Sequence, residues 1–364
     1  MVHSLPCCDP GNFKEENEGK AIMTDFVIPV QPPPMKKAQR DYPITEGENL
    51  LRAFRHEKPM YVPCLYQATQ FVIPKPYARG TQNRSTDCVD WFGTLYKHEP
   101  LQEGVTPIKP FPMKEVADWR QMRWPDIKAM DWTEGYADFH RNENLALACR
   151  CFGNGTFEQL HFSEGFEQCL IDMLMETREC RSFFERLTDF KIELFNLQND
   201  VYHYDYACHN DDWSNAKNQF FSCQIFEEAL LEPSVRLAEA VKGAGCRYML
   251  HTCGRMEVWL PYIVNDLKVD LVEIQSINDI DYILETYGDR LTVEYLPDPY
   301  IMYNPATTAE QAREYARSLV DRFGAHRHKG SGLVVRLNGN IPESHYAFED
   351  ELFNYSLKLY AGLQ

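Results

Sequence analysis

Short apolar runs alternate with amphipathic stretches through the C-terminal half of this chain. The apolar runs predict strands at 201–206, 246–251, 270–274, 291–295 and 332–337. The amphipathic stretches predict helices at 222–242, 256–266, 277–287, 308–323 and 347–360. Strands that alternate with helices at this spacing indicate βαβ units and a parallel sheet. The predicted fold class is therefore α/β, and the repeat favours a (β/α)8 barrel of the TIM type.

The first part of the chain has a less regular pattern. Residues 1–46 are polar and contain a proline run, so we expect an N-terminal arm before a barrel domain that spans 47–364. Apolar positions predict a short helix over 46–57, a first strand over 61–65 and a longer helical stretch over 166–194.

Residues 77–132 are rich in proline, tryptophan and charge, and their periodicity is weak. Long irregular segments in compact domains are usually functional, so we predict a long irregular insertion near the barrel mouth. Its tryptophans, Trp119, Trp124 and Trp132, either surround an opening or pack into a surface excursion. The sequence leaves both interpretations open.

Composition and charge narrow the classes of partner. The chain has 364 residues and a formal net charge of -17, which argues against nucleic acid and against an anionic membrane surface as partners. We find no apolar run as long as a membrane span and no signal-peptide pattern at the N-terminus. The twelve cysteines follow no framework spacing, which indicates reduced thiols and a cytoplasmic protein.

The most informative motif is His251-Thr252-Cys253-Gly254, at the end of the strand predicted over 246–251. Residues i and i+2 of a strand point the same way, so an imidazole and a thiolate can aim at one point. A catalytic zinc site needs three protein ligands and an open position, and this motif supplies two of the three. The alternative, a buried histidine and a buried free thiol, stays open.

Barrel active sites lie at the C-terminal ends of the strands, and polar residues follow each strand predicted here. They are Asp205 to Asp212, His251, Cys253, Glu273, Gln275, Glu294, Asn338 and Asn340. We expect Asp211 and Asp212 to act as general acids or bases in the pocket, with a helix-capping acidic turn as the alternative.

Several of these residues also carry a family resemblance. The run Asp211-Asp212-Trp213…Gln219…Ser222…Phe226, followed by His251-Thr252-Cys253-Gly254…Leu260-Pro261, resembles the uroporphyrinogen decarboxylase superfamily. It is most similar to the corrinoid-dependent, zinc-containing methyltransferase branch, in particular the O-demethylase substrate methyltransferases. Asp90-Trp91-Phe92-Gly93, Asp118-Trp119 and Trp124-Pro125-Asp126 also resemble this family, and the resemblance spans residue 46 to the C-terminus.

The resemblance implies a distorted (β/α)8 barrel with its site in the mouth. In the methyltransferase members, His-x-Cys and a later cysteine hold zinc, which acts as a Lewis acid, and a separate corrinoid protein exchanges the methyl group. His251 and Cys253 match the first two ligands. The later cysteine would fall near Asn338-Gly339-Asn340, and no cysteine follows Cys253. Glu294 or Glu273 is the expected third ligand, and the loss of a thiolate favours an ether or amine leaving group over a thiol substrate.

On this basis we expect a methyltransferase that moves a methyl group from a small methylated donor, an aryl methyl ether, to a corrinoid protein. The expected cofactors are zinc and a corrinoid (cobalamin) carried by that partner protein, and a homodimer is left open. The residues expected in catalysis are Asp211, Asp212 and His251, and the expected metal ligands are His251, Cys253 and Glu294. The residues expected to bind substrate are Tyr66, Gln67, Trp91, Trp213 and Asn338.

Two alternatives remain, a metal-free carboxy-lyase of the uroporphyrinogen decarboxylase type and a non-catalytic ligand-binding barrel. Uroporphyrinogen decarboxylases carry an early Arg-Gln-Ala-Gly-Arg stretch whose arginines bind substrate carboxylates. The corresponding residues 64–71 contain no arginine here. An uncompensated acidic mouth would repel a substrate with eight carboxylates, so we expect decarboxylation of that tetrapyrrole to be disfavoured.

Overall fold

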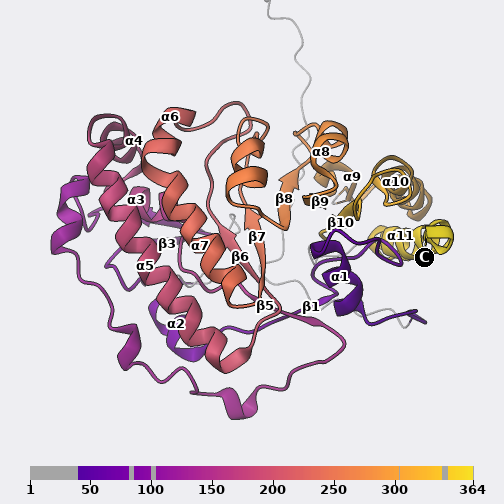
Figure 1. Cartoon of the computed structure of the whole chain (residues 1–364), viewed down its shortest axis with the longest axis horizontal. Helices are drawn as coiled ribbons and strands as arrows, with labels where there is room; N and C mark the ends of the chain where they lie inside the picture. Colours follow the sequence, from indigo (N-terminus) through magenta and orange to yellow (C-terminus); the bar gives the residue numbers. More distant parts are fainter. Residues whose placement is uncertain (1–39, 82–85, 100–103, 303, 338–342, 364) are drawn as a thin grey trace, which may run out of the picture.

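The computed structural model describes residues 40–81, 86–99, 104–302, 304–337 and 343–363. Its main sheet has seven strands, all parallel, which curl with helices on the outside (Figure 1). Their spatial order is β1 (Thr69–Phe71), β5 (Ala146–Cys149), β6 (Tyr206–Asn210), β7 (Arg247–His251), β8 (Leu271–Gln275), β9 (Thr292–Leu296) and β10 (Leu333–Val335).

The two edges of this sheet are linked by the segment that precedes β1. Cys64 forms a parallel bridge with Val335 of β10, supported by hydrogen bonds of 2.9 Å from Leu65 N to Val335 O and from Val335 N to Pro63 O. The strand predicted at 61–65 is thus a single bridge, and the first full strand begins at Thr69. The architecture is consistent with the predicted TIM-type fold, with seven strands rather than eight in the described part of the chain.

The helices that follow the strands cover the outside of the sheet (Figure 1). The longer ones are α1 (Glu46–Phe54), α3 (Thr156–Glu164), α4 (Phe166–Met175), α5 (Thr177–Tyr202), α7 (Leu231–Gly243), α8 (Ile280–Tyr287), α10 (Ala309–Phe323) and α11 (Glu343–Tyr360). Short elements are α2 (Lys75–Gly80), α6 (Cys223–Ile225), α9 (Pro299–Met302) and the π-helical turns Phe226–Leu230 and Tyr262–Asp266. The helical segment predicted from residue 222 begins there, with Ser222 as its N-cap, because its hydroxyl accepts from Ile225 N.

One predicted strand is wrong in its position. Residues 201–206 read as a strand, but α5 continues to Tyr202 and ends at His203, whose φ of 52° is left-handed. The tyrosine alternation that suggested a strand begins inside the helix, where Tyr202 is buried as part of the apolar face. The strand β6 begins at Tyr206, so His209 and Asn210 lie in a strand and not in the predicted loop.

The segment between β1 and β5 contains a second, antiparallel sheet. Its strands are β2 (Cys88–Val89), β3 (Leu95–Glu99) and β4 (Gly104–Ile108), in that order. The three tryptophans for which two roles were predicted, Trp119, Trp124 and Trp132, all pack against the core and none lines the cavity, so the packed excursion describes them. Trp119 and Trp124 pack with ring centroids 6.4 Å from that of Phe183 on α5, whereas Trp91 faces a cavity beside the barrel.

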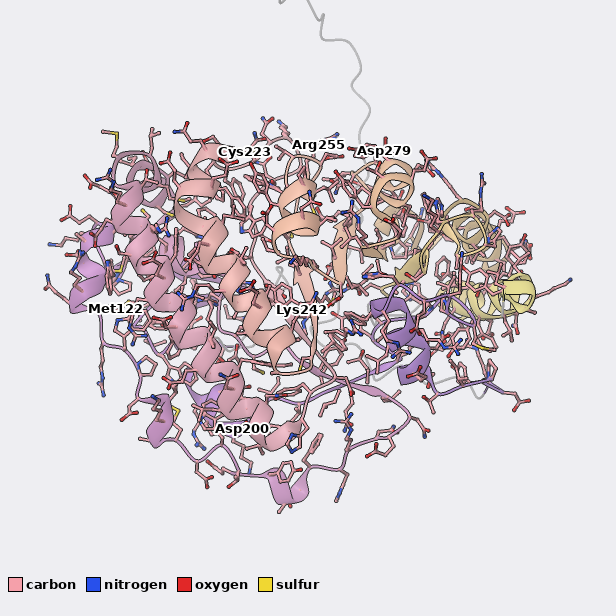
Figure 2. All side chains as sticks on the ribbon, viewed as in Figure 1. Met122, Asp200, Cys223, Lys242, Arg255 and Asp279 are labelled. Carbon is pink, nitrogen blue, oxygen red and sulfur yellow. The ribbon has the colours of Figure 1, made fainter. Side chains whose placement is uncertain are left out.

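Figure 2 distinguishes the two ends of the barrel. Arg255, which follows β7, and Asp279, the N-cap of α8, lie at one end together with Cys223 at the start of α6. Asp200 and Lys242, near the C-terminal ends of α5 and α7, lie at the other end. The first end is therefore the carboxyl end of the strands, where barrel enzymes place their sites.

Most of the predicted N-terminal arm, residues 1–39, lies outside the described residues. In the part of the chain that is described, no helix combines the length and apolar character needed to cross a membrane.

Candidate active site

Strand register brings polar side chains together above an apolar layer. Met249 of β7 and Leu271 of β8 are register partners, fully buried in one apolar cluster inside the sheet. Because strand side chains alternate between faces, the residues two positions later, His251 and Glu273, share that inner face and are again partners. Glu294 of β9 is in turn the partner of Glu273. The inner face thus changes from apolar to ionisable at the carboxyl end of the strands.

The imidazole of His251 is held from one side by a carboxylate. Its Nδ1 lies 2.8 Å from Oε2 of Glu273, and the other oxygen of Glu273 forms an ion pair with Arg336. Burial opposes ionisation of Glu273, but the contacts with His251 and Arg336 hold the pKa of this carboxyl below its ordinary value. Glu273 therefore orients the ring and leaves Nε2 as the nitrogen that faces outward.

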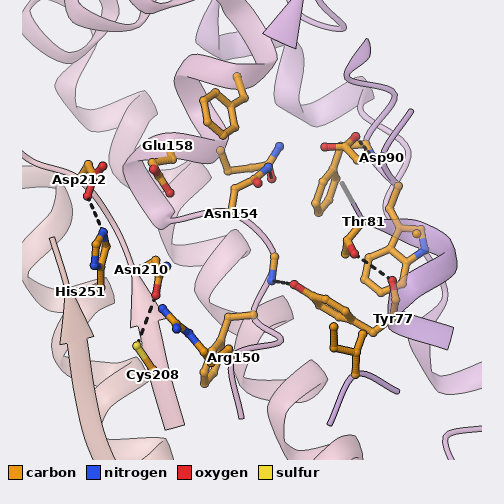
Figure 3. A pocket seen from close by; sticks show the side chains of 18 of the residues that line it. Tyr77, Thr81, Asp90, Arg150, Asn154, Glu158, Cys208, Asn210, Asp212 and His251 are labelled. Atoms are coloured by element: carbon orange, nitrogen blue, oxygen red, sulfur yellow. Dashed lines mark hydrogen bonds and ion pairs between the residues drawn. The ribbon is translucent and has the colours of Figure 1, made fainter. Parts of the chain in front are cut away.

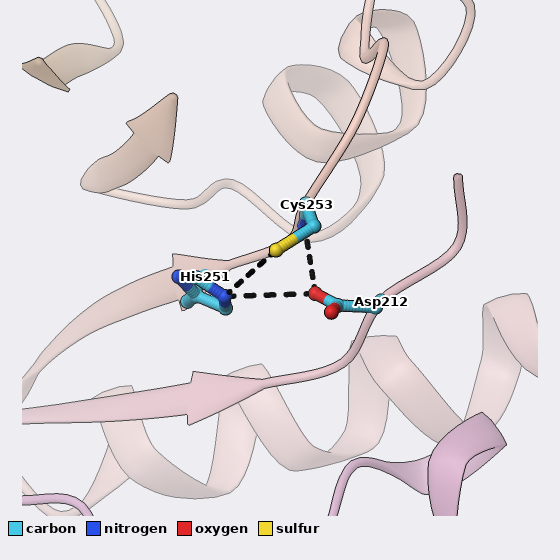
Figure 4. Close-up of side chains that lie close together, drawn as sticks. All are labelled: Asp212, His251 and Cys253. Atoms are coloured by element: carbon cyan, nitrogen blue, oxygen red, sulfur yellow. Dashed lines mark hydrogen bonds and ion pairs between the residues drawn. The ribbon is translucent and has the colours of Figure 1, made fainter. Parts of the chain in front are cut away.

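That nitrogen is one of three potential ligand atoms, from His251, Cys253 and Asp212, that lie close together (Figure 4). Nε2 of His251 lies 3.5 Å from Sγ of Cys253 and 3.6 Å from Oδ1 of Asp212. The backbone N of Cys253 donates to the same Asp212 oxygen at 2.7 Å, which ties the ends of β6 and β7 together. Among the described residues, this is the one group of three or more His, Cys, Asp or Glu side chains with metal-ligand geometry.

The spacing of these atoms fits zinc. Typical zinc bond lengths in a tetrahedral site place nitrogen and sulfur ligands about 3.6 Å apart and nitrogen and oxygen ligands about 3.4 Å apart. The contact of Nδ1 with Glu273 adds the carboxylate that zinc-bound histidines commonly carry on their other nitrogen. Burial and the nearby Asp212 raise the pKa of the Cys253 thiol, so a bound cation would have to displace its proton.

Gly254 makes the turn that aims Cys253. Its φ of +84° is left-handed, and a Cβ at this position would lie 2.5 Å from the backbone oxygen of Asn215. Its backbone N donates to Oε1 of Gln275 at 3.0 Å. The left-handed φ and the close approach of the Asn215 backbone both require glycine here, because a residue with a Cβ would have to move the neighbouring loop.

Asp212 and His251 face a cavity of about 590 Å³ (Figure 3). One wall is aromatic and is formed by Tyr66, Tyr77, Trp91, Phe92, Phe152, Phe162 and Phe190. The polar lining consists mainly of Asp90, Arg150, Asn154, Glu158, Gln159, Asn210, Asp212, His251 and Arg336. The arrangement joins a three-ligand group to a pocket large enough for a single-ring substrate.

The predicted substrate-binding residues lie in different places. Tyr66 and Trp91 line the cavity. Gln67 does not, and instead lines a narrow crevice with Tyr61. Trp213 is buried away from the cavity, where its indole donates to Asp211 at 2.9 Å. Asn338 lies outside the described residues.

Asp211 is a helix cap. It is fully buried and accepts from Phe157 N at 3.0 Å and from Glu158 N at 3.3 Å, in the first turn of α3. A Cβ on Gly155 would lie 2.2 Å from Oδ1 of Asp211, so glycine is needed for this approach. The capping alternative describes Asp211, and the structure does not place it on the cavity wall.

Glu294, the predicted third ligand, lies outside the group formed by His251, Cys253 and Asp212. Its carboxylate is fully buried, and burial together with the neighbouring Glu273 raises its pKa to about 8. Asp212 takes the third position because it lies two residues beyond the end of the adjacent strand β6, whereas Glu294 lies two strands from β7.

Sequence reasoning missed Arg150, Arg336 and Glu158. Arg150 directly follows β5, for which no strand end was predicted, and Arg336 directly follows β10 but lies inside the strand predicted over 332–337, so the strand-end rule pointed to neither. Their presence corrects the expectation of an uncompensated acidic mouth. Glu158 lies in the first turn of α3, and burial followed by Asp212 and Asp211 raises its pKa to about 8.

Comparison with known proteins adds one finding. The model of the family "Uroporphyrinogen decarboxylase (URO-D)" matches residues 158–338, which include β6 to β10 and all three members of the metal-ligand group. No curated protein matches the chain. The family match, together with the parallel curled sheet, supports placing this protein in the uroporphyrinogen decarboxylase superfamily.

Proposed function

We propose that this protein is a zinc-dependent methyltransferase that moves a methyl group from a small methylated donor, an aryl methyl ether, to a corrinoid protein. The observation that carries the proposal is the convergence of His251 Nε2, Cys253 Sγ and Asp212 Oδ1 beside an aromatic-walled cavity. When bound there, zinc would supply Lewis-acid polarisation of the ether oxygen.

The ligand set favours a neutral oxygen leaving group. One imidazole, one thiolate and one carboxylate carry the same two formal negative charges as one imidazole and two thiolates, but a carboxylate donates less electron density to the metal than a thiolate, so the zinc would be the stronger Lewis acid. His251 is kept in one tautomer by Glu273, so its Nε2 is the ligand nitrogen. Asp212 is both a ligand and the acceptor that holds the backbone of Cys253.

The aromatic wall and Glu158 complete the proposed roles. The rings of Tyr77, Trp91 and Phe190 lie on the cavity wall and offer faces and edges against which an aryl donor can pack. Glu158 lines the same cavity and, with its pKa raised to about 8, holds a proton at neutral pH. That proton would neutralise the oxygen released from the ether.

The test is the metal content of the purified chain by elemental mass spectrometry. We expect about one zinc per chain in the wild type and a drop of more than tenfold in His251→Ala, Cys253→Ser and Asp212→Asn. Methyl transfer from an aryl methyl ether to cob(I)alamin should be lost in the same three variants. Glu294→Gln is the matched control, since Glu294 is a buried carboxylate outside the ligand group, and it should keep its zinc. Retained zinc and turnover in His251→Ala would refute the proposal.

A metal-free carboxy-lyase is the second candidate, because the matched family is named for decarboxylation and because Arg150 and Arg336 line the cavity. It predicts release of CO2 in the presence of a chelator and without a corrinoid partner. Zinc-free wild-type protein that decarboxylates a porphyrinogen would establish this candidate in place of the first.

A further inference from the structure

Two arginines meet at Tyr66 on one side of the cavity. Nη1 of Arg150 donates to the hydroxyl of Tyr66 at 3.1 Å, and the guanidinium carbon of Arg336 lies 5.0 Å from the centre of the Tyr66 ring. All three residues line the cavity that Asp212 and His251 also face. Figure 3 shows the side chain of Arg150 pointing toward Asn210, between His251 and Tyr77.

The two guanidinium groups differ in how their charge is balanced. Arg336 forms an ion pair with Glu273. Arg150 donates to a neutral hydroxyl, and no carboxylate in the described parts of the chain forms an ion pair with it. Glu273 stabilises the charge of Arg150 from a distance, but a guanidinium has five N–H donors in a planar fork, and the one hydrogen bond of the Arg150 side chain within the described residues is that to Tyr66. Arg150 thus presents unused donors to the cavity.

The acidic residues that line the cavity, Asp90, Glu158 and Asp212, accept hydrogen bonds from groups other than Arg150. Asp90 accepts from Phe92 N and Thr94 N at 2.9 Å and from the Tyr96 hydroxyl at 3.0 Å. Asp212 accepts from Cys253 N at 2.7 Å, and Glu158 accepts from Gly155 N at 2.8 Å. These carboxylates do not neutralise Arg150 at contact distance.

We propose that Arg150 and Tyr66 form a carboxylate-binding position, and that the methyl donor is therefore an aromatic acid. This inference rests on the proposed function, which places the ether oxygen of the donor near His251 and Asp212. The carboxylate would accept two parallel N–H bonds from Arg150, the geometry in which guanidinium and carboxylate fit best. Tyr66 already accepts from Arg150, so its own O–H is available to donate to the same carboxylate.

The experiment measures binding of two matched probes, 3-methoxybenzoate and 3-methoxybenzamide, to the full chain by isothermal titration calorimetry. The probes differ in charge and hardly in size. We expect the wild type to bind the acid at least about tenfold more tightly than the amide. Arg150→Met should weaken binding of the acid about tenfold or more and change binding of the amide less than about twofold. Arg150→Lys should recover part of the loss, because an ammonium keeps the charge but not the fork.

Arg290→Met is the matched control, because Arg290 is an exposed arginine that contacts Asn265 and Asp289. It should bind both probes as the wild type does, and circular dichroism should show the wild-type fold in all three variants. Equal affinity of the wild type for acid and amide would overturn the proposal. So would unchanged acid affinity in both Arg150 variants, or no binding of the acid at millimolar concentration.

The same titrations are repeated after chelation, because the Arg150 position needs neither zinc nor a corrinoid protein. A chain that binds no zinc but still prefers the acid would refute the proposed methyl transfer and leave the carboxylate position standing. A chain that binds zinc but has equal affinity for the acid and the amide would refute the carboxylate-binding position and leave the proposed methyl transfer standing.

Discussion

The metal-ligand group and the aromatic wall come from different parts of the chain and are held in place differently. His251 and Cys253 follow one strand and Asp212 follows its neighbour, so strand register sets their separation. Tyr77, Trp91 and Phe92 belong to the segment between β1 and β5, outside the barrel sheet, and are held mainly by ring packing.

This difference separates chemistry from selectivity. A register-fixed group can keep ligand atoms within tenths of an ångström, which a metal site requires. A wall whose residues come mostly from segments outside the barrel sheet tolerates changes in shape while the barrel stays intact. The family match begins at residue 158 and covers the ligand group, while Tyr66, Trp91 and Arg150 precede it. The substrate preference of this chain should therefore be sought first in residues before 158, which supply most of the aromatic wall, while Phe162 and Phe190 of the matched region complete it.

The largest effect of a substitution is expected at Gly254, which follows directly after Cys253 of the metal-ligand group. Gly254→Ala forces a Cβ against the backbone of Asn215 and strains a left-handed residue, so it should destabilise the fold by about 2–4 kcal/mol. Cys253 should also move, and zinc content should fall. Denaturant unfolding and elemental analysis measure the two effects. Gly243→Ala is the control, since nothing lies within 4 Å of a Cβ there, and wild-type stability in Gly254→Ala would contradict the account.

A smaller effect is expected at Glu273, which supports the group without belonging to it. Glu273→Gln keeps the size of the side chain but removes the charge beside His251 and Arg336. Zinc affinity should fall about 10- to 100-fold, the range seen when the carboxylate partner of a metal-bound histidine is lost. Competition with a chromophoric chelator gives the dissociation constant. An unchanged constant would show that backbone position alone orients the imidazole.

Much of the barrel could be predicted from the sequence, because apolar strands and amphipathic helices have distinct periods. The helix predicted over 308–323 is an example, since the structure has a helix over Ala309–Phe323 with Thr308 as its N-cap. The same reasoning placed a strand at 201–206, because a run of alternating tyrosines has the period of a strand even though its first two residues belong to α5 and only its last residue belongs to β6. The local sequence pattern cannot show where α5 ends and β6 begins, because tertiary packing decides that boundary.

The parts of the site that depend on residues close in sequence could be predicted. The parts that depend on which strands are neighbours in space could not. His251 and Cys253 share one strand end, so their pairing follows from the two-residue period. The choice of Asp212 over Glu294 depends on strand order, which one sequence does not contain. Asp211 and Asp212 are adjacent, yet one caps α3 and the other joins the ligand group. Arg150 follows β5, a strand of four residues whose end the apolar pattern did not predict, so no strand end pointed to it.

The smallest effect of a substitution is expected at Trp91, which belongs to the aromatic wall of the cavity. Its ring lies 5.9 Å from Tyr77 and 6.2 Å from Phe190, and Gly80 packs beneath it so closely that a Cβ would overlap the indole. Trp91→Leu should weaken binding of both methoxy probes about three- to tenfold, because acid and amide share the ring that packs there. Zinc content should not change.

Trp119→Leu is the matched control for Trp91. Trp119 belongs to the same segment, but its indole donates to Glu179 at 2.6 Å and its ring packs on α5 rather than on the cavity. Its loss should lower thermal stability and leave both probe affinities at the wild-type values. If Trp91→Leu instead loses zinc, the wall and the ligand group are coupled, and the separation of selectivity from chemistry fails. If it changes only probe affinity, the segment before residue 158 can be altered to change the donor while the register-fixed group stays as it is.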